Sequence, residues 1–365
     1  MKHIKNVFLS AIHQHAGKTT IALGLYKLFV EHGIKTSFIK PIGQKYVMVH
    51  HQAIDKDSYL INAVYHCGRH LKEMSPVTIG RGFTEKYIFH PSNKKLRQQI
   101  MESFNSLSLR KNAMIVEGTG HAGVGSVIDF SNADVASMLK SKVIIISEGG
   151  IGKSIDEIML NKALFDLHEV EILGVIINKV IPEKYEKIEK HLRQGLKNKG
   201  LRLLGVIPHN PVLSSPTVFQ IMQQLNLRLI CGEKNIRTRV KNTIIAAMEP
   251  HNMIAYIEDH TLVVTSGDRI DNILVSISSH LLSRGKKFNV AGIILTGGML
   301  PSARIIDLLW KSEIPVLLSE DDTYTVAANI KSLICKIENT DKDKIMEAVA
   351  LVKKHVDAKM ILDNL

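Results

Sequence analysis

Short aliphatic runs alternate with longer amphipathic segments through the N-terminal part of the chain. Runs rich in Val, Ile and Leu are typical of strands that helices cover on both faces of a parallel sheet. The expected strands are Val7–Ser10, Thr36–Ile39, Ala113–Glu117, Val143–Ser147, Leu173–Asn178 and Leu203–Ile207, and the expected helices lie near Lys18–Glu31, Ser58–Tyr65, Asn132–Leu139, Ile155–Leu167 and Lys184–Gly195. We therefore predict an α/β fold with a doubly wound, mainly parallel sheet.

Prolines and serines interrupt this alternation between Pro208 and Pro216. We place a domain boundary there and predict a first domain over residues 1–212 and a smaller α/β domain over residues 213–365. The smaller domain is expected to contain strands Thr261–Thr265, Ala291–Leu295 and Val316–Leu318 and helices Arg269–Ser283, Ala303–Lys311, Thr323–Leu333 and Asp341–Ala358. We expect Thr217–Glu249 to supply a helix, a short strand and another helix. The segments Val77–Ile88 and Pro91–Ser108 are ambiguous, and a helix and an inserted loop both remain open for them.

Composition narrows the class of protein. The 365-residue chain is 45% hydrophobic and 22% charged, as globular proteins are, and it contains no apolar stretch of membrane-spanning length. Its three cysteines form no C-x-x-C pair, which suits the reducing cytoplasm where we expect the protein. The formal net charge of +12 suits a nucleic-acid partner. However, the densest basic stretch, Lys184–Arg202, alternates with glutamates as a solvated helix face does, so we do not expect nucleic-acid binding.

The first aliphatic run passes directly into Gly17-Lys18-Thr19 and then into an amphipathic segment. A tight loop before a helix lets backbone N–H groups surround a phosphate, while a Lys ammonium approaches the outer phosphates and a hydroxyl reaches Mg²⁺. The P-loop pattern also has a glycine where this chain has Ile12, so only the second half of the pattern is present. The alternative interpretation is an ordinary turn from a strand into a helix.

Lys40 and Glu117 each follow or end an expected strand. The C-terminal ends of strands line the ligand crevice of a doubly wound sheet, so Lys40 would point toward the same place as Lys18. Glu117 would offer an oxygen ligand to Mg²⁺ there. The alternative for Lys40 is a surface residue before a proline turn.

Two glycine-rich segments compete with the first loop. Gly118–Gly123 satisfies G-x-G-x-x-G, but no helix opens directly on it, so we interpret it as a flexible loop that closes over a substrate. Gly149–Ser154 follows a strand and precedes a helix, and it is the alternative phosphate loop. The Lys40 turn and the Glu117 strand favour the first loop, because they accompany it in the expected order.

These motifs resemble dethiobiotin synthetase and, more closely, the N-terminal region of long phosphate acetyltransferases and stand-alone proteins of that type. The resemblance covers about residues 1–212 and runs in order through Phe8–Thr19, Lys40–Gln44, Asp55–Asp57, Val116–Gly125, Gly149–Ile155 and Gly174–Lys179. It implies a P-loop NTPase-type fold that binds ATP and Mg²⁺.

The resemblance also implies roles for individual residues. The nucleotide would contact Ala16, Gly17, Lys18, Thr19, Thr20 and Asn178, with Asn178 at the adenine, and Mg²⁺ would be held by Thr19, Asp57 and Glu117. The catalytic residues would be Lys18 and Lys40. Lys18 would stabilise charge on the transferred phosphoryl group, and Lys40 matches the lysine that serves the reacting substrate of dethiobiotin synthetase.

The chain departs from dethiobiotin synthetase at two places. Ala11-Ile12 stands where that enzyme has Gly-Thr, and Gln44 stands where it has a serine that contacts the substrate, so dethiobiotin synthesis is not expected. The second domain resembles the DRTGG domain through Gly267–Arg269 and Thr296–Gly298. No segment before Leu365 resembles an acetyltransferase domain, so we expect a stand-alone form.

Two functions agree with these features. The first is ATP-dependent phosphoryl transfer to a carboxylate or carbamate of an unidentified small-molecule acceptor, followed by attack of an amine or amide nitrogen. The second is a regulatory module that senses nucleotide and acts on a partner enzyme of acetyl-phosphate or acetyl-CoA metabolism. We also expect a homo-oligomer that does not bind membranes.

Overall fold

The computed structural model describes residues 4–67, 71–282 and 290–365, which form two compact units. Unit 1 comprises Met1–Asn210 together with Ile337–Leu365, and unit 2 comprises Pro211–Lys336. The division between them falls inside the predicted boundary segment, but the chain returns to unit 1 after unit 2 ends. The predicted second domain, residues 213–365, is therefore too long at its C-terminus.

Unit 1 contains most of the elements that the sequence predicts. Its strands are β1 (Lys5–Ala11), β2 (Thr36–Ile39), β3 (Ile42–Gly43), β4 (Tyr46–Val49), β5 (Gln52–Asp55), β6 (Val77–Thr78), β7 (Ala113–Glu117), β8 (Lys142–Glu148), β9 (Ile172–Val180) and β10 (Leu203–Pro208). Its α-helices are α1 (Lys18–Glu31), α2 (Lys56–Tyr65), α3 (Leu71–Met74), α4 (Phe83–Phe89), α5 (Lys94–Ser108), α6 (Asn132–Met138), α7 (Gly152–Leu167), α8 (Tyr185–Asn198), α15 (Lys342–His355) and α16 (Ala358–Asp363), with 3-10 turns at Ser126–Ile128 and Pro182–Lys184. The sequence left two segments open. Val77–Ile88 forms β6 and most of α4, and Pro91–Ser108 contains α5.

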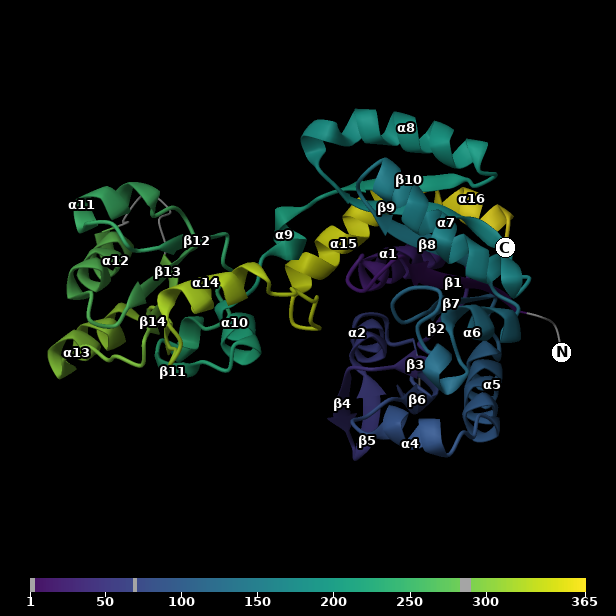
Figure 1. Cartoon of the computed structure of the whole chain (residues 1–365), viewed down its shortest axis with the longest axis horizontal. Helices are drawn as coiled ribbons and strands as arrows, with labels where there is room; N and C mark the ends of the chain where they lie inside the picture. Colours follow the sequence, from purple (N-terminus) through teal and green to yellow (C-terminus); the bar gives the residue numbers. More distant parts are fainter. Residues whose placement is uncertain (1–3, 68–70, 283–289) are drawn as a thin grey trace. The chain divides into compact units, whose positions relative to one another are not determined.

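A six-stranded parallel sheet in the order β10-β9-β8-β1-β7-β2 forms the core of unit 1 (Figure 1). The central strands β1, β7 and β8 are buried along nearly their whole length, because helices cover both faces of the sheet. Strand β1 lies between β7 and β8. Strands β2 and β7 lie on one side of β1, and β8, β9 and β10 lie on the other, so the strand order reverses at β1. Ligands of doubly wound sheets bind at the C-terminal ends of strands at such a point.

The C-terminal helix α15 packs against α1, the helix that follows β1 (Figure 1). Gly24 of α1 lies so close to Val352 of α15 that a methyl group at Gly24 would overlap the Val352 side chain. Lys353 Nζ also lies 2.9 Å from Glu31 Oε2. The helix predicted over Asp341–Ala358 is thus present, but it belongs to unit 1.

Unit 2 is the smaller α/β unit. Its strands are β11 (Arg228–Cys231), β12 (Asn242–Ile245), β13 (Thr261–Ser266), β14 (Val290–Thr296) and β15 (Val316–Leu318), and its helices are α9 (Pro211–Ser214), α10 (Val218–Gln224), α11 (Pro250–Met253), α12 (Ile270–Leu282), α13 (Ala303–Ser312) and α14 (Thr323–Lys331), with 3-10 turns at Glu233–Asn235 and Ile254–Tyr256. The second helix expected within 217–249 is wrong, because residues 242–245 pair with β13 as an edge strand. The predicted end of a helix at Ser283 lies outside the described residues.

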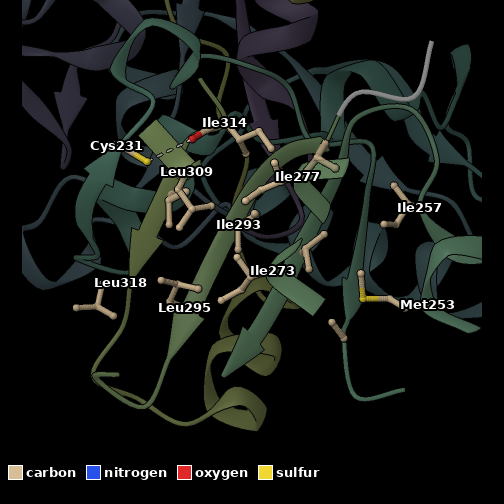
Figure 2. Close-up of a cluster of buried hydrophobic side chains, with 14 residues drawn as sticks. Cys231, Met253, Ile257, Ile273, Ile277, Ile293, Leu295, Leu309, Ile314 and Leu318 are labelled. Atoms are coloured by element: carbon tan, nitrogen blue, oxygen red, sulfur yellow. Dashed lines mark hydrogen bonds between the residues drawn. The ribbon is translucent and has the colours of Figure 1, made fainter. Parts of the chain in front are cut away.

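The strands of unit 2 lie in the order β11-β15-β14-β13-β12, and only β11 is antiparallel to its neighbour. Successive residues of β13 belong to different apolar clusters. Val263 packs in the cluster that contains Ile273 of α12, which Figure 2 shows, whereas Val264 packs in the cluster that contains Val326 of α14. Helices therefore cover both faces of this sheet as well. Across the described ranges of both units, no helix is both long and apolar enough to cross a membrane.

Candidate functional site

The loop between β1 and α1 contains two residues in the left-handed region of backbone conformation. His15 and Gly17 adopt positive φ angles of 67° and 101°, and Gly17 is the N-cap residue of α1. Ile12, where the P-loop pattern has glycine, is not among the described residues with positive φ, and its N–H donates to the carbonyl of Ile146 at 3.0 Å. The loop therefore accepts a side chain at residue 12 without backbone strain.

Two residues at the C-terminal end of β9 hold this loop in place. Asn178 Nδ2 donates to the carbonyl oxygen of Ala16 at 2.9 Å, and Asn178 Oδ1 accepts from the N–H of Lys179 at 2.9 Å. Lys179 Nζ donates to the carbonyl of His15 and to Glu148 Oε1, both at 2.7 Å. Both ends of the Asn178 amide are thus used within the protein. The predicted adenine contact by Asn178 would require an exchange of these hydrogen bonds.

Lys18 and Thr19 form the first turn of α1, between buried Ala16 and half-buried Thr20. Thr19 Oγ1 donates to Glu117 Oε1 at 3.1 Å, and the Lys18 charge is close enough to Glu117 to favour its carboxylate form. Strands β1 and β7 are paired in register up to Leu9 and Glu117, which brings this carboxylate to the loop. Two of the three predicted Mg²⁺ ligands, Thr19 and Glu117, are therefore in contact.

Lys40 lies among three carboxylates, and all four side chains are more than nine-tenths buried. Its Nζ contacts Asp57 Oδ2 directly and lies 3.4 Å from Asp55 Oδ1 and 3.5 Å from Glu117 Oε1. Burial opposes the charged ammonium, but attraction to Asp57, Glu117 and Asp55 outweighs it and raises the pKa of Lys40. The structure thus joins Lys40 to both predicted metal-binding carboxylates and adds Asp55, which the prediction did not include.

Asp55 contributes to this arrangement because it begins α2. Its Oδ1 accepts from the N–H of Asp57 at 2.8 Å, which makes Asp55 the N-cap of the helix. The N-cap bond fixes the start of α2, where both Asp55 and Asp57 lie beside Lys40. An Asp two residues before another Asp at the start of a predicted helix was the signal for this role in the sequence.

Of the three carboxylates around Lys40, Glu117 has a buried oxygen without a hydrogen-bond partner among the described residues. Burial raises the pKa of Glu117 to about 7, although Lys40 lowers it. Its Oε1 accepts hydrogen bonds from Thr19 and Lys40, whereas Oε2 is buried without a hydrogen-bond partner among the described residues. A buried carboxylate oxygen without a donor is unfavourable, and it is a suitable ligand for a hard divalent cation.

No group of three or more acidic, His or Cys side chains is arranged around a metal position in the described residues. Mg²⁺ at nucleotide sites keeps several waters and takes phosphate oxygens, with only one or two carboxylates from the protein. Thr19, Asp57 and Glu117 therefore fit a metal that arrives with a nucleotide, and they do not form a complete cage by themselves.

The glycine-rich segment Gly118–Gly123 is held on several sides. Asn132 of α6 accepts from the N–H of Thr119 at 3.0 Å and donates to the carbonyls of Thr119 and His121 at 2.9 and 2.7 Å. Gly120 accepts from the N–H of Ala11 at 3.2 Å, beside the phosphate loop. These hydrogen bonds tie the segment to α6 and to the end of β1, and its closure over a substrate stays a prediction. No sequence motif pointed to Asn132.

The alternative phosphate loop, Gly149–Ser154, does not direct its lysine to the carboxylates. Lys153 has a side chain that is 84% exposed, and its ion pair is with Glu157 on its own helix at 3.7 Å. Lys18, by contrast, is buried beside Glu117. The geometry therefore favours the first loop.

Comparison with protein families identifies both units. A family model described as an AAA domain matches residues 5–217, which is more than half of the chain, and a DRTGG domain model matches residues 220–333. The second match lies within unit 2, as the Gly267–Arg269 and Thr296–Gly298 motifs predict.

Phosphate acetyltransferases are similar to this chain along nearly its whole length. The enzyme of Nitratidesulfovibrio vulgaris is 27% identical over 363 residues, covering 97% of this chain and 50% of the enzyme. The enzyme of a Synechocystis species is 25% identical over 370 residues, covering 99% of this chain and 52% of the enzyme. The chain thus spans about half the length of these relatives, and the predicted resemblance to their N-terminal region is confirmed.

Similar solved structures include a putative plasmid partition protein from Borrelia burgdorferi bound to AMPPNP, with a TM-score of 0.39 and 16% identity over 57% of this chain and 88% of that one. The CBS and DRTGG domains of the regulatory region of Clostridium perfringens pyrophosphatase, complexed with diadenosine tetraphosphate, have a TM-score of 0.28 and 16% identity over 48% of this chain and 85% of that one. Neither similarity bears on the chemistry of the site.

Proposed function

The chain belongs to the AAA domain family, and we propose on that basis that unit 1 binds ATP together with Mg²⁺. The observation that carries this proposal is the convergence of Lys18, Thr19 and Glu117 beside a loop that ends in a glycine N-cap. The first N–H groups of a helix have no partner within the helix and carry a partial positive charge, and both properties favour a phosphate at the N-terminus of α1.

The residues of the loop and the nearby carboxylates would then have separate roles. Residues 16–20 would surround the phosphates, with the Lys18 ammonium on the outer ones. The Thr19 hydroxyl would turn from Glu117 toward the metal, and Glu117 and Asp57 would hold the metal directly or through water. Bound Mg²⁺ would neutralise charge on the outer phosphates.

We further propose that the γ-phosphoryl group passes to a carboxylate or carbamate of a small-molecule acceptor. An acceptor oxygen attacks the γ-phosphorus, the bond from that phosphorus to the bridging oxygen breaks, and ADP leaves. An amine or amide nitrogen then attacks the activated carbon, the bond from that carbon to the phosphate oxygen breaks, and the departing phosphate takes up the proton that the nitrogen releases. The acceptor oxygen is already anionic, so the first step needs no general base. Lys18 would stabilise the developing charge, and Lys40 would orient the acceptor.

Replacement of Lys18 tests the nucleotide site. We expect Lys18→Ala to weaken ATP binding by about 100-fold or more, because a charge-assisted contact with two phosphates is lost. Equilibrium titration with a fluorescent ATP analogue measures this change. Lys153→Ala is the matched control, and it should alter the affinity by less than about twofold. Greater damage from Lys153→Ala would identify Gly149–Ser154 as the phosphate loop.

A nucleotide-sensing role is the second candidate function. It is favoured by the extent of the match to phosphate acetyltransferases, which continues through both units of this chain. In this role, ATP in unit 1 would change the state of the DRTGG unit and, through it, a partner enzyme of acetyl-phosphate or acetyl-CoA metabolism. Such coupling requires that ATP favour one of two states of unit 2.

Hydrogen exchange separates the two candidates. A sensor should show ATP-dependent protection of the DRTGG motifs, residues 267–271 and 296–298, in the full chain. An enzyme should instead release phosphate faster when its acceptor is added, and Lys40→Ala should remove that stimulation. Unchanged protection together with stimulated phosphate release would exclude the sensor.

A further inference from the structure

Lys40 contacts the carboxylates that the proposed function assigns to Mg²⁺. Glu117 Oε1 lies 3.5 Å from Lys40 Nζ and 3.1 Å from Thr19 Oγ1, and Asp57 Oδ2 also contacts the same ammonium. Asp55 completes the shell at 3.4 Å. The ammonium therefore lies where a metal held by Asp57 and Glu117 would have to bind.

We propose that Lys40 is a tethered cation that keeps this carboxylate site closed to divalent metals until ATP is bound. When Mg²⁺ arrives with ATP, Lys40 gives up Asp57 and Glu117 and moves its ammonium to the γ-phosphate and the acceptor. This inference rests on the proposed function, because it assumes that the same crevice binds ATP.

The requirement for ATP follows from the burial of Lys40. An ammonium in a buried site is stable only beside an anionic partner, and breaking a buried ion pair from one side is strongly unfavourable. Mg²⁺ alone would take Asp57 and Glu117 from Lys40 and leave its ammonium with Asp55 alone, at 3.4 Å, and no new partner. ATP provides that partner in its γ-phosphate, so metal and nucleotide should enter together.

Glu117 shows that the lysine satisfies this site only in part. An ammonium has three N–H donors, and Lys40 Nζ already lies near three carboxylates. Glu117 Oε2 remains buried without a hydrogen-bond partner among the described residues. A small divalent cation accepts more ligands than an ammonium donates to and could use this oxygen.

Metal binding without nucleotide tests the proposal. Mn²⁺, titrated by electron paramagnetic resonance, serves as the probe in full-length wild type, Lys40→Met and the control Lys153→Met. We expect Lys40→Met to bind one Mn²⁺ at least about tenfold more tightly than wild type, which corresponds to about 1.4 kcal/mol. Lys153→Met should behave as wild type, and adding Glu117→Gln to Lys40→Met should abolish the gain.

A second variant guards against loss of the fold. Lys40→Met leaves three buried carboxylates without their cation, so Lys40→Met/Asp55→Asn is titrated in parallel. The added change restores the net charge of the cluster, and Asn retains the N-cap bond of α2. Thermal unfolding shows which of the variants is folded, and the folded ones should gain Mn²⁺ binding.

A folded Lys40 variant that binds Mn²⁺ no more tightly than wild type would overturn the inference. Wild type that binds Mn²⁺ without nucleotide as tightly as the folded Lys40 variants do would overturn it as well. The proposed function fails separately, if wild type does not bind ATP with Mg²⁺ or if Lys18→Ala leaves that binding unchanged.

Discussion

At the scale of single residues, the position of the Asn178 side chain requires a glycine at residue 17. A methyl group at Gly17 would overlap the Asn178 amide, and that amide donates to the carbonyl of neighbouring Ala16. Gly17 also has a φ of 101°, which side chains rarely allow. The phosphate loop is thus shaped by a residue at the end of β9 as well as by its own sequence.

Asn178→Ala should weaken the binding of ATP and of GTP by the same factor. The lost bond to Ala16 loosens the loop whichever base is attached, and one hydrogen bond corresponds to about a three- to tenfold change in affinity. Competition titrations with both nucleotides measure the two factors. Asn198→Ala, at the exposed end of α8, is the control and should change neither. A loss confined to ATP would instead show that Asn178 contacts the adenine, as the resemblance implies.

At the scale of elements, the burial pattern of helix α1 indicates that other elements cover it on more than one side. Its buried residues run without a break from Ile21 to Tyr26, so no face of this part of the helix is polar and exposed. A helix that is apolar all round is covered on every side. The sheet covers one side of α1, and α15 packs against another. The sequence of α1 therefore held a sign that a further helix was required.

Gly24→Ala should destabilise unit 1, by about 1–3 kcal/mol, because the new methyl group would overlap Val352. In a helix interior without that neighbour, the same change would stabilise by about 1 kcal/mol. Urea unfolding of the variant measures the sign. Val352→Gly with and without Gly24→Ala is the matched control. Removal of the Val352 Cβ, the atom nearest to the new methyl group, reopens the space, so Gly24→Ala should destabilise that background little. A stabilised Gly24→Ala would mean that α15 does not pack at this position.

At the scale of the whole molecule, unit 2 is an insertion between two parts of unit 1. Residues 211–336 form one compact unit, and both flanking segments belong to the other. Unit 1 therefore completes its fold only when the chain returns with α15 and α16. Loop-closure cost grows slowly with the length of an insertion, so such an arrangement is tolerated.

Unit 1 should fold and bind ATP when residues 211–336 are replaced by a flexible Gly-Ser linker of about ten residues. A chain that ends at residue 212 lacks α15, so α1 would expose apolar side chains and the unit should unfold at a lower temperature. Calorimetry and ATP titration of the two proteins, beside the full chain, make the comparison. Equal stability of the two shortened proteins would show that α15 is dispensable.

Elements were largely predictable from the sequence because they depend on local patterns. Aliphatic runs between amphipathic segments predicted the six strands of the main sheet, and the rule for strand ends placed Lys40 and Glu117 at one edge. Strand β12 was missed because it is a short edge strand of four residues. Edge strands are half exposed and lack a continuous apolar run.

The sequence by itself determined the alternation of strands and helices, the phosphate loop and the identity of both units. Only the tertiary structure decided that α15 covers α1, that Asn178 holds the loop and that Lys40 lies among three carboxylates. Periodicity shows that a helix has an apolar face, but it does not name the surface that the face covers. Contacts between residues distant in sequence depend on how whole elements pack, and local patterns carry no record of that packing.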